Sequence, residues 1–125
     1  MASARRTTDE LIAQGHPLVD SHAMTVAQLK AELDSGANPI LLDVREPDEL
    51  DISRLDGVTL IPMGEIPDRY TELDPNSDIV LVCRSGSRSA KVMAFLDEMG
   101  FTRLRNLDGG MNAWATEIDP SLPVY

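Results

Sequence analysis

The chain has 125 residues, of which 42% are hydrophobic and 26% are charged, and its formal net charge is −10. This is the size of one domain and an ordinary globular composition, and the excess of negative charge excludes nucleic acid as a general partner. No apolar run approaches the ~20 residues of a membrane span, and the first residues contain no apolar leader, so we expect no membrane contact and a cytoplasmic protein.

The first part of the chain is polar and has no long apolar period. We therefore interpret residues 1–22 as an N-terminal arm or linker and residues 23–125 as the folded domain. One short helix is predicted inside the arm, from Thr8 to Gln14. His16 and His22 also lie in this part, and we interpret both as surface residues rather than catalytic bases, because no motif connects them to the rest of the chain.

From Met24 onward, predicted strands and helices alternate. Four segments are predicted as strands: residues 40–44, 58–61 and 79–82 are mainly apolar, and residues 103–107 form a last, more polar strand. Helices are predicted at residues 25–35, 46–50, 66–73 and 88–99, and again after Gly109-Gly110. The first of these helices opens with capping-box spacing from Thr25 to Gln28. This alternation is typical of the α/β class, a parallel sheet with helices on both faces.

Three chemically active side chains stand where predicted strands end. They are Asp43, Cys83 and Asp108. Because parallel strands end at the same edge of a sheet, and ligands of such folds bind beyond that edge, we expect these side chains to lie close together.

Cys83 is the only cysteine of the chain. A lone cysteine excludes an internal disulfide and, with only two histidines present, a thiolate-based zinc site, so no metal or cofactor is expected. It is followed by a short polar loop that opens a helix, where unpaired N–H groups attract a thiolate or a small anion. Arg84, Arg88 and Lys91 add positive charge. We therefore predict a lowered pKa and a nucleophilic thiolate, rather than an inert buried side chain.

The loop after the cysteine is predicted to bind the substrate. Its residues are Arg84, Ser85, Gly86, Ser87, Arg88 and Ser89. Small residues let the backbone direct several N–H groups at one point. Arg84 is expected to be exposed and to select an anionic substrate. For Arg88 we favour a share in substrate electrostatics over capping of the helix start. The three serines are interpreted as loop-shaping groups, because no His/Asp pair accompanies them.

Residues outside this loop are interpreted mainly as structural. Asp43 and Arg45 could orient the loop through an ion pair, and we favour structural support for both. Gly109-Gly110 is predicted to form a turn, because no Lys-Ser/Thr pair of a phosphate loop follows it. Trp114 is predicted to pack in the core. An acidic run is interpreted as a solvated face, with docking of a basic partner as the alternative; its members are Glu46, Asp48, Glu49 and Asp51.

Three segments resemble the signature segments of rhodanese-like sulfurtransferase domains. They are residues 43–46 (Asp-Val-Arg-Glu), residues 83–89 (Cys-Arg-Ser-Gly-Ser-Arg-Ser) and residues 109–114 (Gly-Gly-Met-Asn-Ala-Trp). The resemblance covers about residues 24–119. It implies that residues 23–125 form a five-stranded parallel rhodanese-like domain. It also implies that Cys83 accepts a sulfane sulfur and holds it as a persulfide, cradled by the loop amides.

The residues themselves allow the same chemistry. A thiolate among N–H donors can attack the outer sulfur of thiosulfate or of another persulfide, and a second nucleophile can then remove that sulfur. With no second cysteine, the acceptor must be external. We therefore expect small sulfur donors such as thiosulfate, with a sulfur carrier protein or a persulfide-donating protein as candidate partners.

The end of the sequence bears on the choice of partner. Residues 119–125 (Asp-Pro-Ser-Leu-Pro-Val-Tyr) resemble the tail of rhodanese domains fused behind ubiquitin-activating-like adenylyltransferases of molybdopterin and thiamine biosynthesis. The resemblance implies sulfur transfer to a small carrier protein. A free-standing thiosulfate sulfurtransferase is the alternative.

Two other functions are open at this point. Cysteine-dependent phosphatases share this fold, but their loop is one residue longer, and the spacing from Cys83 to Arg88 matches the shorter, sulfur-sized type. A non-catalytic interaction module is the other alternative, and the presence of Cys83 in a complete loop argues against it.

Overall fold

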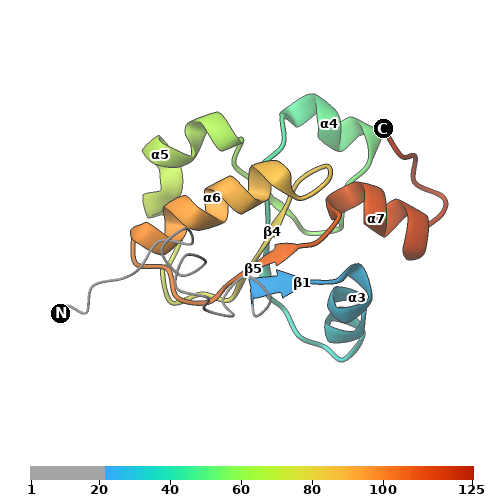
Figure 1. The fold of residues 1–125 in the computed structure, drawn as a ribbon, viewed down its shortest axis with the longest axis horizontal. Coiled ribbons are helices and arrows are strands. Elements are labelled where there is room, and N and C mark those ends of the chain that lie inside the picture. The colour runs from blue at the N-terminus through green and yellow to red at the C-terminus, as the bar shows by residue number, and fades with distance from the viewer. Residues whose placement is uncertain (1–21) are drawn as a thin grey trace, which may run out of the picture.

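The computed structural model describes residues 22–125 of the chain. The helix predicted from Thr8 to Gln14 and the residue His16 lie outside these described residues. Within them, five parallel strands form one sheet in the order β1-β5-β4-β2-β3 (Figure 1). The strands are β1 (Ala23–Met24), β2 (Ile40–Asp43), β3 (Thr59–Leu60), β4 (Ile79–Val82) and β5 (Leu104–Leu107). The predicted α/β class with a five-stranded parallel sheet is confirmed.

Helices follow each strand and cover the sheet. In the described part of the chain the α-helices are α3 (Val26–Asp34), α4 (Pro47–Ile52), α5 (Ile66–Arg69), α6 (Ser87–Glu98) and α7 (Gly110–Glu117). Two 3₁₀ helices flank α5, namely η1 (Met63–Glu65) and η2 (Tyr70–Glu72). No helix within residues 22–125 combines the length and the apolar character needed to cross a bilayer.

The sequence patterns predict the bounds of most of these helices and strands to within a residue or two. At the start of α3, the amide of Gln28 donates to the Thr25 hydroxyl at 3.1 Å, and the amide of Thr25 donates to the Gln28 side chain at 2.8 Å. This is the predicted capping box. The single helix predicted at residues 66–73 is instead α5 followed by η2, because the ends of short helices tighten readily into 3₁₀ turns. Strand β1 is missed by the sequence pattern, since two residues are too few to show a period.

Side chains of the central strands alternate between the two faces of the sheet and bury two separate apolar clusters. On β4, Ile79 and Leu81 pack with α5 and α6. Val80 and Val82 pack with α3 and α7 on the other face. Trp114 belongs to this second cluster and is 8% exposed, so its predicted place in the core is confirmed. Figure 1 shows α6 and α5 on one side of the sheet and α3 on the other.

The register of the sheet brings the predicted site residues to one edge. Asp43, at the end of β2, pairs with Val82 of β4, so Cys83 follows directly beside it. Asp108 follows β5, and its amide donates to the Met24 carbonyl at 2.8 Å. All three strand-end residues therefore lie at the carboxyl edge of the sheet, as predicted. His22 precedes β1 and lies at the opposite edge, which fits its interpretation as a non-catalytic residue.

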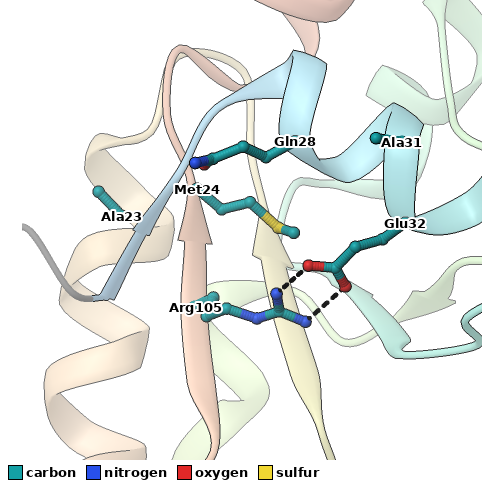
Figure 2. Close-up of a pocket in the computed structure, with 6 residues that line it drawn as sticks. All are labelled: Ala23, Met24, Gln28, Ala31, Glu32 and Arg105. Atoms are coloured by element: carbon teal, nitrogen blue, oxygen red, sulfur yellow. Dashed lines mark hydrogen bonds and ion pairs between the residues drawn. The ribbon is translucent and has the colours of Figure 1, made fainter.

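A groove occupies the α3 face of the sheet, away from the cysteine (Figure 2). It has a volume of about 420 Å³ and is lined by Ala23, Met24, Gln28, Ala31, Glu32 and Arg105. Arg105 forms ion pairs there with Glu32 and Asp78, so its charge is compensated. Because neighbouring strand residues point to opposite faces, Arg105 faces this groove while Asn106 faces the cysteine loop.

Candidate active site

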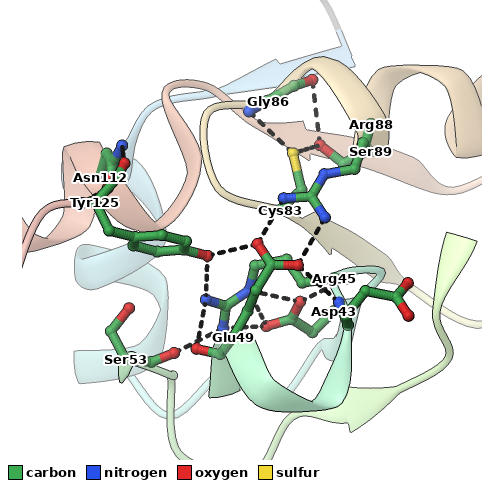
Figure 3. A network of polar contacts seen from close by, with 11 residues as sticks. Asp43, Arg45, Glu49, Ser53, Cys83, Gly86, Arg88, Ser89, Asn112 and Tyr125 are labelled. Carbon is green, nitrogen blue, oxygen red and sulfur yellow. Dashed lines mark hydrogen bonds and ion pairs between the residues drawn. The ribbon is translucent and has the colours of Figure 1, made fainter. Parts of the chain in front are cut away.

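The sulfur atom of Cys83 faces the loop that opens α6 (Figure 3). The backbone N–H of Gly86 donates to this sulfur at 3.0 Å, and the Ser89 hydroxyl lies 3.2 Å from it. Gly86 has a φ of 104°, in the left-handed region that glycine adopts without strain, and this turns its amide back toward the sulfur. The predicted orientation of the thiol toward the loop and the helix start is therefore confirmed. Cys83 itself is 1% exposed.

The pKa of the Cys83 thiol lies below its ordinary value, as predicted, although burial is the largest single influence and raises it. Hydrogen bonds from the Ser89 hydroxyl and from the amides of Ser89, Gly86 and Ser85 together outweigh that effect. These donors stabilise the thiolate directly. The neutral donors of the loop, rather than the arginines emphasised by the sequence pattern, therefore lower the pKa.

Ser89 has a second neighbour that the sequence pattern does not indicate. Its hydroxyl also lies within hydrogen-bond distance of the side-chain oxygen of Asn106 and of the Gly86 carbonyl. The amide nitrogen of Asn106 donates to the same Gly86 carbonyl at 3.1 Å. A hydroxyl has only one proton to donate. Asn106 therefore competes with the sulfur for the Ser89 proton and fixes the position of the hydroxyl above Cys83.

We expect Ser89→Ala to raise the pKa of the Cys83 thiol. A hydrogen bond to a charged group contributes more than one between neutral groups, so the loss of the Ser89 hydroxyl destabilises the thiolate. Because iodoacetamide alkylates only the thiolate, the alkylation rate at a pH below the pKa should fall by about three- to tenfold. The measurement is the alkylation rate as a function of pH, which should shift to higher pH. Ser35→Ala, which removes a hydroxyl at the end of α3, is the control. An unshifted profile for Ser89→Ala would show that the hydroxyl does not stabilise the thiolate.

Asp43 and Arg45 form a buried ion pair at the end of β2, beside the cysteine. Asp43 and Arg45 both have 0% exposed side chains, and Arg45 binds the Asp43 carboxylate through Nε and Nη2, the latter at 2.7 Å. Its remaining N–H groups donate to the Ser53 and Glu49 carbonyls and to the Tyr125 hydroxyl. All five N–H donors of this guanidinium are therefore used. This geometry agrees with the favoured structural role of Asp43 and Arg45.

Arg88 is held by a carboxylate from α4. Its two terminal nitrogens donate to the two oxygens of Glu49, each at 2.7 Å. Glu49 also accepts from the Glu46 amide and from the Tyr125 hydroxyl, and its side chain is only 15% exposed. Bonding by Arg88 above all lowers the pKa of Glu49 to about 2, against an opposing effect of burial. The assignment of Glu49 to a solvated face is therefore wrong, whereas Glu46, Asp48 and Asp51 are exposed as predicted.

The ion pair also changes the interpretation of Arg88. A bidentate pair of this kind compensates the charge of the guanidinium before any substrate arrives. Arg84, in contrast, is exposed as predicted, and its guanidinium carbon lies 5.3 Å from the centre of the Tyr125 ring. The two arginines of the loop therefore differ: one is bound to a carboxylate and one is stacked on an aromatic ring.

The start of α7 lies against the cysteine loop. The amides of Met111 and Asn112 donate to the carbonyls of Cys83 and Arg84 at 2.8 and 3.0 Å. A Cβ atom on Gly110 would lie 2.3 Å from the Cys83 carbonyl oxygen. Gly109 lies in the predicted turn and caps α7, whereas Gly110 is the first residue of the helix and allows the close approach of the two backbones.

No cluster of three or more His, Cys, Asp or Glu side chains suited to a metal ion occurs within residues 22–125. What the site offers instead is one activated sulfur atom, a ring of hydrogen-bond donors and an exposed arginine.

The comparison with known protein families agrees with this geometry. The model of the Rhodanese-like domain matches residues 25–117. The chain belongs to the rhodanese-like domain family. The expected membership is therefore confirmed, and the matched range contains Cys83 and its loop.

Relatives of this rhodanese-like domain include proteins named as sulfurtransferases. The putative sulfurtransferase YtwF of Bacillus subtilis is 38% identical over 97 residues, which are 78% of this chain and 93% of YtwF. The probable adenylyltransferase/sulfurtransferase MoeZ of Mycobacterium tuberculosis is 38% identical over 104 residues, which are 82% of this chain but only 26% of MoeZ. The domain thus corresponds to nearly all of one relative and to about a quarter of the other.

Solved structures agree with the fold. A rhodanese-like domain protein from Staphylococcus aureus superposes with a TM-score of 0.71 at 33% identity, covering 82% of this chain and 97% of that one. The CoADR-RHD protein of Bacillus anthracis superposes with a TM-score of 0.72 at 31% identity, covering 87% of this chain and 19% of that one.

Several residues of this rhodanese-like domain's site carry no sequence signal of a contact with the cysteine loop or its arginines. Glu49 has a weak one, since it stands three residues after Glu46 at the capping-box position of α4. Asn106, Asn112 and Tyr125 reach the cysteine loop only through the folding of the chain. Tyr125 donates to Glu49 at 2.9 Å across 76 positions of sequence.

Proposed function

We propose that this rhodanese-like domain is a sulfurtransferase that moves a sulfane sulfur through a persulfide on Cys83. The observation that carries the proposal is the buried Cys83 sulfur, which accepts from the Gly86 amide and has a lowered pKa. A sulfur atom placed among hydrogen-bond donors suits transfer of a sulfur that is itself anionic after attachment.

The first step begins with attack of the Cys83 thiolate on the outer sulfur of thiosulfate. A new S–S bond forms, the S–S bond of thiosulfate breaks, and sulfite leaves with the bonding electron pair. The resulting Cys–S–S⁻ carries its charge on the terminal sulfur, where the loop amides and Ser89 can donate to it. A persulfide donor reacts in the same way and leaves as a thiolate.

The second step restores the enzyme. An external thiolate, on a small molecule or on a partner protein, or cyanide attacks the terminal sulfur; a bond from the acceptor to that sulfur forms, the S–S bond breaks, and the Cys83 thiolate departs with the electron pair. We infer that the acceptor is external because Cys83 has no partner cysteine. Two steps with a covalent intermediate predict ping-pong kinetics.

For the donor, we propose that the loop from Arg84 to Ser89 forms the binding site. Arg84 is its exposed cation, while Arg88 holds Glu49 and the start of α6 in place. For the acceptor, the names of relatives favour a sulfur carrier protein. The putative sulfur carrier protein YrkF of Bacillus subtilis is 34% identical over 96 residues, 77% of this chain and 52% of YrkF. Because a free thiol persists in reducing compartments, we place the reaction in the cytoplasm.

A phosphatase reaction is disfavoured by charge as well as by loop length. The positive charge of Arg88, which would attract a phosphate dianion, is compensated by the two oxygens of Glu49 that accept from it. A purely non-catalytic role is disfavoured by the lowered pKa of the Cys83 thiol.

The test is intact-mass spectrometry of the protein before and after incubation with thiosulfate. We expect a gain of one sulfur atom, which disappears when cyanide is added and thiocyanate forms. With p-nitrophenyl phosphate we expect no hydrolysis. A protein that gains no sulfur from thiosulfate or from a persulfide donor, or that hydrolyses the phosphate ester instead, would overturn the proposal.

A further inference from the structure

Tyr125 lies beside the cysteine loop and is held by three kinds of contact (Figure 3). Its hydroxyl donates to Glu49 at 2.9 Å and accepts from Arg45 at 2.8 Å. Its main-chain nitrogen and oxygen pair with the side chain of Asn112, each at 3.1 Å. Its ring lies under the Arg84 guanidinium. The ring is therefore fixed at both ends and offers its face to a charged side chain.

The positive charges around Cys83 are not equally available to an anion. Arg45 is neutralised by Asp43 and Arg88 by Glu49. Within residues 22–125, Arg84 has neither an ion pair nor a hydrogen bond from its guanidinium, and it is exposed. Lys91 is also exposed, but it lies further along α6 and lines a groove with Phe95. Arg84 is thus the available cation closest in sequence to the thiol.

A free arginine on a loop samples many rotamers, and fixing one costs conformational entropy. Stacking on an aromatic face restricts the guanidinium without consuming its charge, because the ring is uncharged. The backbone is restricted as well, since the Asn112 amide that donates to the Arg84 carbonyl belongs to the residue that also binds Tyr125. Asn112 and Tyr125 therefore hold both the main chain and the side chain of Arg84.

We infer that Tyr125 is a positioning residue for anionic sulfur donors: its ring holds the Arg84 guanidinium at the mouth of the loop, where the charge steers the donor to Cys83. The inference rests on the proposed function and specifies its substrate class, small anions. The hydroxyl has a separate task, which is to bind Glu49 and Arg45.

Substitutions at Tyr125 can separate the ring from the hydroxyl. Tyr125→Phe keeps the ring, and Tyr125→Leu removes it. We measure the rates at which iodoacetate and iodoacetamide alkylate Cys83, because the two reagents react alike but only the first is an anion. Exposed cation–π contacts are weak, so Tyr125→Leu should lower the iodoacetate-to-iodoacetamide ratio by about two- to fivefold. Tyr125→Phe should keep most of the ratio. The KM for thiosulfate should rise similarly in Tyr125→Leu, with a smaller effect on kcat.

Arg84→Gln supplies the matched comparison. It should lower the iodoacetate-to-iodoacetamide ratio at least as far as Tyr125→Leu does. The ratio of the double variant, Arg84→Gln with Tyr125→Leu, should equal that of Arg84→Gln alone, because the ring acts through the arginine. The difference should shrink in high salt, as expected for steering by an exposed charge. An unchanged ratio in Tyr125→Leu, or an equal loss in Tyr125→Phe, overturns the inference.

The alkylation ratio separates this inference from the proposed function. If wild-type protein gains no sulfur from thiosulfate or a persulfide but the ratio falls as described, sulfur transfer is wrong and steering by Arg84 stands. If sulfur is gained and the ratio does not respond to Tyr125→Leu, the transfer proposal stands and the role of Tyr125 is wrong.

Discussion

Replacement of Cys83 by serine should reduce the kcat/KM for thiosulfate by about a thousandfold or more. A serine hydroxyl does not ionise near neutral pH, and within residues 22–125 no His/Asp pair stands beside position 83 to remove its proton. Oxygen also cannot hold the transferred sulfur as a persulfide. Since Cys83 is the only cysteine, no second thiol can substitute for it.

The result is read from two measurements on the same protein. Steady-state transfer of sulfur to cyanide gives the rate, and intact mass gives the loading of the protein. We expect Cys83→Ser to remain folded, because serine is close to cysteine in size and can accept the same bond from the Gly86 amide. Thermal unfolding checks this. Transfer at a rate near that of the wild type, with a folded Cys83→Ser protein, would remove the persulfide from the mechanism.

The sequence predicts those parts of the site that are local in the chain. Cys83 and Gly86 are three residues apart, and the strand before them and the helix after them have clear periods. The bond between Sγ and the Gly86 amide follows from this arrangement alone. Similarly, Asp43 and Arg45 are two residues apart at a strand end, so their ion pair could be anticipated.

The charge balance of the site could not be predicted in the same way. Whether Arg88 offers its charge to a substrate depends on Glu49, which is 39 positions away in the sequence. Whether Arg84 is mobile or held depends on Tyr125. Such contacts form only when α4, α6 and α7 meet at the carboxyl edge of the sheet. A pattern of charges in one segment therefore indicates an electrostatic role but not which of its charges stay uncompensated.

This balance has a consequence for the chemistry. Arg45 and Arg88 are neutralised by carboxylates, while neutral N–H and O–H donors lower the pKa of the thiol. Fixed dipoles of this kind stabilise charge without attracting a permanent counterion. In the proposed mechanism the Cys83 sulfur accepts a second sulfur and releases it again, and stabilisation by such dipoles does not bind the departing anion tightly.

The second large effect is expected at the buried ion pair. Arg45→Met should destabilise the protein by about 3–5 kcal/mol, because it leaves the Asp43 carboxylate buried and without its partner. Asp43 and Arg45 are both 0% exposed, so water cannot replace the lost guanidinium without opening the core. The Ser53 carbonyl, which accepts from Arg45 at 2.7 Å, also loses its donor. The measurement is urea unfolding, with the midpoint and slope compared with those of the wild type.

Two further variants test whether the loss of stability in Arg45→Met comes from the unpaired, buried carboxylate of Asp43. Arg69→Met removes an arginine that pairs with Glu65 and Glu72 at the surface, and it should change the unfolding midpoint far less, because water and salt screen exposed ion pairs. Combining Arg45→Met with Asp43→Asn removes the uncompensated charge and should restore part of the lost stability, because a neutral amide is less costly to bury than a carboxylate. If the double variant were less stable than Arg45→Met alone, the cost would lie in the lost packing and carbonyl bonds of Arg45 instead. The ion pair would then matter through the shape of the guanidinium rather than through its charge.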